Sequence, residues 1–176
     1  MFTFILILAP WFITYLFPLD YDYYKQINLP WFAPPNLFYI IAWTAIYILV
    51  AISVVCLLES YKFKDIPLSY KLALLVNYIF NQSYVLVFFG LKNNFLGFAS
   101  CVGTLVSLVF LANEAYKLKP KCVKYLIPYG LLSIFAVVLS TVALCACGAK
   151  DENTVYVYNW GEYIDPEVIT MFEEET

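Results

Sequence analysis

Apolar runs long enough to cross a bilayer constrain this chain more than any other feature of its sequence. A hydrocarbon core about 30 Å thick is crossed by about 20 helical residues. The runs also lack the alternation that lipid-facing β-barrel strands show. They cover residues 2–19, 37–58, 72–90, 95–112 and 123–145. We therefore predict an all-α integral membrane bundle of five transmembrane helices, with Pro10 tolerated in the first helix because neighbouring helices can cover the carbonyl that it frees.

The amino-acid composition excludes several classes of function. Only 13% of the residues are charged, about half the share in a soluble domain, which excludes a soluble enzyme and a nucleic-acid partner. The chain has no His and no Arg, so histidine metal sites, Ser-His-Asp catalysis and bidentate phosphate binding are excluded. Apart from Lys124 at the edge of the last run, the runs contain no ionisable Asp, Glu, Lys or Arg, unlike proton pumps and ion-coupled transporters.

Lysine distribution predicts the orientation in the membrane. The second and fourth connections between the runs are rich in lysine, whereas the first and third contain only Lys25 and Lys92. The lysines of the rich connections are Lys62, Lys64, Lys71, Lys117, Lys119, Lys121 and Lys124. Because lysine-rich short loops stay in the cytoplasm, we expect the N-terminus inside and the C-terminal tail outside.

The first connection, residues 20–36, is rich in aromatic residues and proline. It contains Tyr21, Tyr23, Tyr24, Trp31 and Phe32, together with Pro30, Pro34 and Pro35. Aromatic rings are enriched where the membrane meets water. The connection is therefore either an interfacial anchor or a lid over a cavity that opens on the outer face.

Neutral polar and aromatic side chains are the candidates for function inside the membrane. Asn77 and Asn81 are four residues apart and share a helix face, with Tyr84 close to the same stripe. Trp43 and Tyr47 form a similar pair in the second run. Two interpretations stay open. The amides could join helices by hydrogen bonds worth about 0.6 and up to about 2 kcal/mol, or they could serve an aromatic pocket for a large, flat, apolar ligand.

The cysteines do not predict a disulfide framework. Cys56, Cys101 and Cys122 lie in the runs or in a connection expected in the cytoplasm, where disulfides are rare. Cys145 and Cys147 are two residues apart, the wrong spacing for a redox pair or a zinc knuckle. Their context, Leu-Cys-Ala-Cys-Gly after an apolar run, resembles a bacterial lipoprotein lipobox, with Cys147 as the possible lipidation site.

Motifs in four parts of the chain, in the same order, resemble those of one membrane family. They are Tyr23-Tyr24 with residues 29–35; Phe38, Trp43 and Ile46-Tyr47; residues 81–90; and Pro128-Tyr129, Phe135-Ala136 and Leu139-Ser140. On these motifs, residues 1–142 resemble the TspO/MBR family, the tryptophan-rich sensory proteins related to the mitochondrial translocator protein.

The resemblance implies a bundle in the bacterial cytoplasmic membrane, often a homodimer. Its cavity would bind porphyrins such as protoporphyrin IX and haem, or sterol-like molecules, as ligands and not as cofactors. The family's lid lysine is replaced by Leu29, which removes one possible partner for a propionate. The ligand-binding positions carried over to this chain are Tyr24, Pro34, Trp43, Tyr47, Asn81, Tyr84, Cys101 and Ala136.

The resemblance also bears on catalysis. Some members of the family are credited with tryptophan-dependent porphyrin breakdown, and Leu132 occupies the position of one family tryptophan. We therefore expect no catalytic residue, no metal site and no enzymatic activity. A porphyrin-degrading membrane enzyme and a ligand-free helical scaffold stay open as alternatives.

The last part of the chain differs from the rest. Residues 150–176 contain one lysine and eight acidic residues, against nine lysines and five acidic residues before them. Residues 153–166 resemble the mature start of a spermidine/putrescine-binding lipoprotein, which adds an anchor for an extracytoplasmic polyamine-binding protein to the alternatives. We predict a TspO/MBR-like transmembrane domain, residues 1–147, followed by an acidic and poorly ordered tail, residues 148–176.

Overall fold

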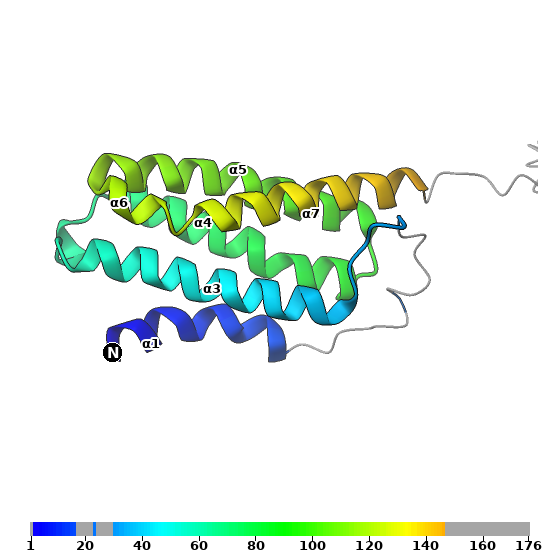
Figure 1. Cartoon of the computed structure of the whole chain (residues 1–176), viewed down its shortest axis with the longest axis horizontal. Helices are drawn as coiled ribbons and strands as arrows, with labels where there is room; N and C mark the ends of the chain where they lie inside the picture. The colour runs from blue at the N-terminus through cyan, green and yellow to red at the C-terminus, as the bar shows by residue number, and fades with distance from the viewer. Residues whose placement is uncertain (1, 17–22, 24–29, 147–176) are drawn as a thin grey trace, which may run out of the picture.

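The computed structural model describes residues 2–16, 23 and 30–146. Every element in these residues is helical, and the long helices run side by side along the long axis of the molecule (Figure 1). The elements are α1 (Phe2–Leu8), η1 (Ala9–Leu16), α3 (Asn36–Leu58), η2 (Phe63–Asp65), α4 (Leu68–Val85), η3 (Leu86–Gly90), α5 (Asn94–Leu118), α6 (Pro120–Val123) and α7 (Ile127–Ala146). The predicted all-α class is confirmed for the described residues, and the acidic tail lies outside them.

Within the described residues, four helices are long and apolar enough to cross a membrane. They cover Leu37–Leu58, Leu68–Gly90, Asn94–Leu118 and Ile127–Cys145. The first run instead contains a shorter apolar helix, Thr3–Ile13. There the α-helix gives way to a 3-10 helix at Ala9, next to Pro10, which has no N–H to donate. The membrane bundle is therefore confirmed, and the fifth crossing stays a prediction.

The ends of α5 extend beyond the predicted run. At its start, the Asn93 side chain accepts a hydrogen bond from the Leu96 N–H at 2.9 Å, a usual N-cap arrangement. At its other end the helix continues through Glu114 and Lys117, which form an ion pair one turn apart. Such a pair supports a helix end where it reaches water.

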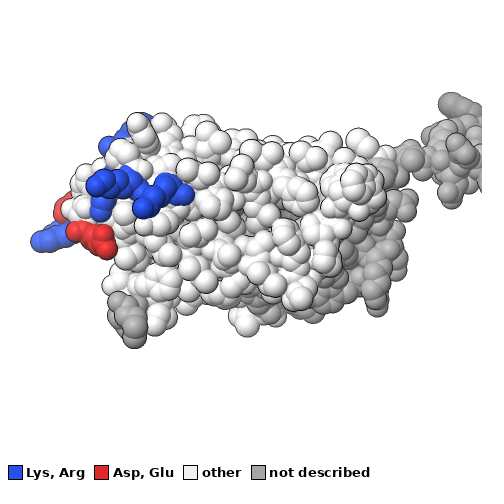
Figure 2. All heavy atoms as spheres, viewed as in Figure 1, with Lys and Arg blue, Asp and Glu red and all other residues white. Residues whose placement is uncertain are grey.

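The main core lies where α3, α4, α5, α6 and α7 meet, with Trp11 of η1 packed into it. Its fully buried members include Val50, Leu57, Ala115 and Tyr129. On the face shown in Figure 2, the Lys, Asp and Glu side chains gather at one end of the bundle, near α6. We call this the lysine-rich end. It carries both lysine-rich connections, and the side of the membrane that it faces stays a prediction.

A disulfide at the lysine-rich end corrects the analysis of the cysteines. Cys56 near the end of α3 is bonded to Cys122 in α6, with 5.9 Å between their Cα atoms. The expectation that these two cysteines stay unpaired is wrong for this structure. Two hydrogen bonds hold the segments together: Ser53 Oγ donates to the Cys122 carbonyl at 3.0 Å, and Lys119 Nζ donates to the Cys56 carbonyl at 2.7 Å. The bonded cysteines are 66 residues apart, so their spacing gave no sign of the pairing.

Candidate functional site

A chain of hydrogen bonds joins three helices in the middle of the bundle. Tyr47 Oη in α3 donates to Asn81 Oδ1 in α4 at 3.1 Å. Asn81 Nδ2 donates to Tyr129 Oη in α7 at 2.9 Å, and this hydroxyl donates to Asn77 Oδ1 at 3.1 Å. We call these four residues the central network. Tyr129 and Asn77 are fully buried, so the bonds form in a medium where an unpaired amide is costly.

The two asparagines play different parts in the central network. Asn77 Nδ2 also donates to the Thr104 carbonyl at 3.1 Å and to Ser107 Oγ at 3.0 Å, both in α5. Every hydrogen-bonding group of this amide is therefore used to join helices, the first of the two interpretations from the sequence. Asn81 bonds two tyrosine hydroxyls, which fixes the positions of their rings.

Tryptophans extend the aromatic surface of the central network. The Trp43 ring lies 6.1 Å from the Tyr47 ring and 6.0 Å from the Tyr129 ring, in an edge-to-face arrangement with the latter. The buried Trp11 ring also lies near Tyr47, with 5.4 Å between the ring centres. The structure thus brings together three of the predicted site residues, Trp43, Tyr47 and Asn81.

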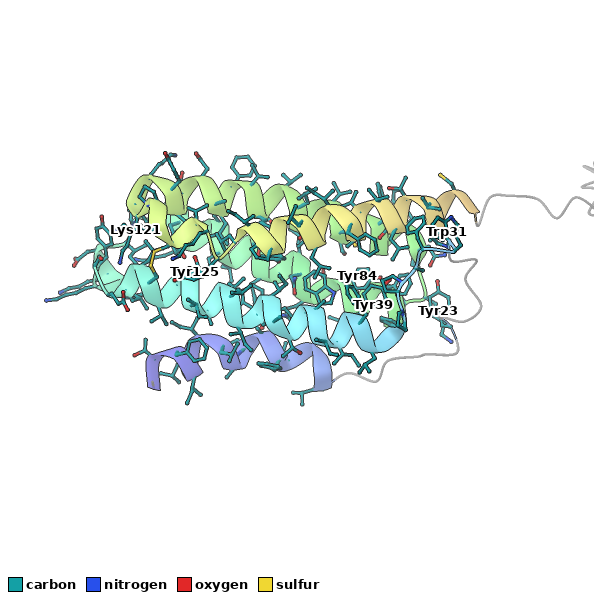
Figure 3. All side chains as sticks on the ribbon, in the orientation of Figure 1. Tyr23, Trp31, Tyr39, Tyr84, Lys121 and Tyr125 are labelled. Carbon is teal, nitrogen blue, oxygen red and sulfur yellow. A yellow bond between two sulfur atoms is a disulfide. The ribbon has the colours of Figure 1, made fainter. Side chains whose placement is uncertain are left out.

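A second aromatic group, which we call the end cluster, consists of Tyr23, Tyr84, Phe88 and Phe89. Tyr84 and Phe88 are stacked at 5.1 Å, and Phe89 and Tyr23 meet Phe88 edge-on at 4.9 and 5.6 Å. Figure 3 shows Tyr23 and Tyr84 toward the end of the bundle opposite Lys121. Phe88 and Phe89 belong to the π-helical turn η3, a local widening that is frequent at functional sites.

The other predicted site residues lie in several places. Ser140 Oγ in α7 donates to the Ala136 carbonyl at 2.6 Å and lies 3.4 Å from Cys101 Sγ in α5, so Ser140 contacts both of these predicted residues. Pro34 is half-buried just before α3. Tyr24 and Cys147 lie outside the described residues. The ligand-binding role of the whole set stays a prediction.

Sequence reasoning missed Tyr129 and Phe88 as parts of these groups. Tyr129 shares a face of α7 with Ser133 and Ala136, since the spacings of four and seven residues match helical turns. That periodicity could have revealed Tyr129. Phe88 is four residues from Tyr84, the same spacing as in the pair of asparagines, and could have been found in the same way.

An apolar groove of about 890 Å³ lies between α4 and α5, away from the predicted residues. Its lining includes the exposed rings of Phe95 and Phe110. Gly103 in its lining lets the Phe80 ring approach closely, because a Cβ there would lie 2.4 Å from that ring. None of the predicted ligand-binding residues lines this groove.

The fold and the site together define the class of protein. The described residues form a multi-pass helical membrane bundle with an aromatic, uncharged interior, and they contain no group of three or more His, Cys, Asp or Glu that could hold a metal ion.

Comparison with known proteins is consistent with this class. Residues 2–145 match the TspO/MBR family. The chain is 34% identical over 125 residues to the Tryptophan-rich protein TspO of Bacillus cereus, an alignment that covers 71% of this chain and 80% of that protein. It is 29% identical over 126 residues to the uncharacterized membrane protein YtaB of Bacillus subtilis, covering 72% and 81%. The chain therefore belongs to the TspO/MBR family, which confirms the resemblance seen in its motifs.

Proposed function

We propose that this protein is a membrane-embedded receptor that binds porphyrins, such as protoporphyrin IX and haem, or similar flat apolar ligands, in tetrapyrrole sensing or transport. The observation that carries the proposal is the position of Trp43, which is half-buried and lies against the rings of both Tyr47 and Tyr129. A flat ring system gains most of its binding energy by burying its faces against such side chains.

The hydrogen bonds assign separate roles to the rings and the amides. Because the Asn81 amide is bonded to Tyr47 and Tyr129, its contribution is to orient these two rings. Trp43, which is half-buried beside these two buried rings, then supplies the contact surface for the ligand. Additional polar capacity comes from Gln82 Oε1 and Ser133 Oγ, two buried oxygens without a hydrogen-bond partner in the part of the chain that the structure describes.

Titration of the detergent-solubilised protein with protoporphyrin IX tests the proposal. Binding is followed by the absorbance of the porphyrin, so that the readout does not depend on the tryptophans being replaced. We expect Trp43→Leu to weaken binding about tenfold, because it removes an aromatic contact surface. Trp31→Leu is the matched control, since Trp31 is 96% exposed, and it should leave the affinity unchanged. Absence of saturable binding to the unaltered protein would contradict the proposal and favour a ligand-free scaffold.

The same titration distinguishes binding from porphyrin degradation. Leu132 packs against the main core at a position where the family resemblance places a tryptophan. We therefore expect the absorbance of bound protoporphyrin IX to stay constant under illumination in air. A steady loss of absorbance that depends on Trp43 would instead favour the enzyme.

A further inference from the structure

The apolar groove between α4 and α5 opens on the outer surface of the bundle. One stripe on each helix forms it, with Leu72, Val76 and Phe80 on α4 and Val106 and Phe110 on α5. Spacings of four residues place these side chains on one face of each helix, and all five are exposed. Because both helices are long and apolar enough to cross a membrane, the groove faces the acyl chains of the bilayer.

The length of the groove matches the depth of a membrane. On α5 its lining extends from Phe95 to Glu114. At about 1.5 Å per residue this separation is about 28 Å along the helix axis, close to the roughly 30 Å of a hydrocarbon core. The Phe80 ring meets Gly103 near the middle of the groove. The half between Gly103 and Glu114 is therefore about as deep as one leaflet.

A charged pair lies where this half of the groove reaches the lysine-rich end. Among the described residues that line the groove, Glu114 is the one with a charge. Its carboxylate accepts hydrogen bonds from Ser69 Oγ and from Lys117 Nζ, and the Lys117 side chain is 60% exposed. A carboxylate offers about four acceptor sites and a lysine ammonium about three donors. Both members of the pair can therefore bond an additional partner.

The shape of the groove favours a lipid over a second copy of the chain. In a two-fold dimer each copy contributes the same surface, so the groove would face an identical groove and leave its volume unfilled. An acyl chain is narrow and flexible and can fill that volume. The charges also agree with a lipid, because the Glu114–Lys117 pair complements a headgroup that carries one ammonium and one phosphate.

We propose that the half of the groove between Gly103 and Glu114 binds an acyl chain of a phospholipid whose headgroup carries a primary ammonium. The chain packs against Val106 and Phe110. The headgroup ammonium donates to the Glu114 carboxylate, and Lys117 Nζ donates to the phosphate. This site lies apart from the central network, so the inference is independent of the proposed function.

Competition between phosphatidylethanolamine and phosphatidylcholine with identical acyl chains tests the inference. The first lipid has an ammonium that donates hydrogen bonds, whereas the quaternary ammonium of the second has no N–H. The full chain is purified in a non-ionic detergent and mixed with equal amounts of the two lipids, and native mass spectrometry identifies the lipid that stays bound. We expect about fivefold more phosphatidylethanolamine than phosphatidylcholine on the protein, the upper range for an exposed ion pair.

Two pairs of variants separate the headgroup from the chain. Glu114→Gln keeps an acceptor for Ser69 but removes the charge, so both lipids should be retained equally. Its control is Glu59→Gln, at a 69% exposed side chain outside the groove, which should keep the preference. Val106→Trp fills the groove and should remove the retained lipid. Its control is Val109→Trp, at an exposed position of the same helix outside the lining, which should retain lipid as the unaltered protein does.

Several results would overturn the inference. They are equal retention of the two lipids by the unaltered protein, a preference that persists in Glu114→Gln, and equal lipid retention by Val106→Trp and Val109→Trp. The same spectra count the copies of the chain in each complex. A dimer that Val106→Trp dissociates without a change in retained lipid would assign the groove to a second copy and overturn the inference as well. If circular dichroism shows that Val106→Trp does not fold, Glu114→Gln and Glu59→Gln still decide the question.

Discussion

The two ends of the bundle are built differently. At the lysine-rich end, the Cys56–Cys122 disulfide and two side-chain hydrogen bonds fasten α3 to α6, and Ala115 and Cys122 are fully buried. At the other end, the rings of Tyr84, Phe88 and Phe89 pack against one another, and Trp31 is almost completely exposed. Covalent and polar links thus fix the helices at one end, while the opposite end presents aromatic surface.

This contrast suggests that one end of the bundle stabilises the fold and the other end presents the binding surface. A binding surface keeps its shape when the elements that carry it are held by a rigid surrounding structure. In the proposed receptor, the lysine-rich end and the central network supply that rigidity, and we expect the rings between Trp43 and Phe88 to supply the contact surface. The following predictions test whether stability and ligand binding can be changed separately.

The largest effect on stability should come from the disulfide. We expect the double variant Cys56→Ser, Cys122→Ser to lose about 2–4 kcal/mol in free energy of unfolding, because the crosslink restricts the unfolded chain. Circular dichroism during unfolding in detergent measures the loss, and a dithiol reductant should destabilise the unaltered protein but not the double variant. Cys145→Ser, at an exposed free cysteine, is the control. Equal stability of all three proteins would contradict the disulfide.

The central network should give a smaller effect. Tyr129→Phe removes a hydroxyl that bonds both Asn77 and Asn81, and we expect a loss of about 1–2 kcal/mol in unfolding free energy because both amides lose a buried partner. Tyr125→Phe, at a half-buried tyrosine of the lysine-rich end, should stay within about 0.5 kcal/mol. If the two variants are equally stable, the network does not hold the helices together.

The smallest effect on stability should come from the end cluster. A Cβ at Gly97 would lie 2.8 Å from the Phe88 ring, whereas a Cβ at Gly130 meets nothing within 4 Å. Gly97→Ala should lose about 1 kcal/mol through overpacking and weaken porphyrin binding by displacing Phe88. Gly130→Ala should instead gain up to about 1 kcal/mol through helix propensity and bind normally. A Gly97→Ala variant with unchanged affinity would separate the end cluster from the ligand site.

Local patterns predicted most of the helices. The apolar run 37–58 coincides with a membrane span, and the runs in α4, α5 and α7 differ from the spans only at their ends. The differences have physical causes: an N-cap at Asn93 starts α5, and an ion pair continues it past the apolar residues. Pro10 interrupts the first run, where length and hydropathy alone predicted a crossing.

Tertiary pairings were less predictable. Helical spacing placed Asn77 and Asn81 on one face, and both bond Tyr129, but nothing local indicated that partner in α7. The disulfide was missed because the lysine distribution predicts a cytoplasmic position for its end of the bundle, whereas disulfides are typical of oxidising compartments. The lysine distribution and the disulfide therefore favour opposite sides of the membrane for this end of the bundle. The contact between Cys56 and Cys122 is a consequence of the fold and has no local signal in the sequence.

Saturation binding of protoporphyrin IX to the purified protein tests the central claim, that the aromatic interior between α3, α4 and α7 binds a flat ligand. The account predicts saturable binding that Trp43→Leu weakens about tenfold and that Trp31→Leu and the cysteine double variant leave unchanged under conditions where both are folded. Binding that is absent, or that all of these variants weaken equally, would contradict the account.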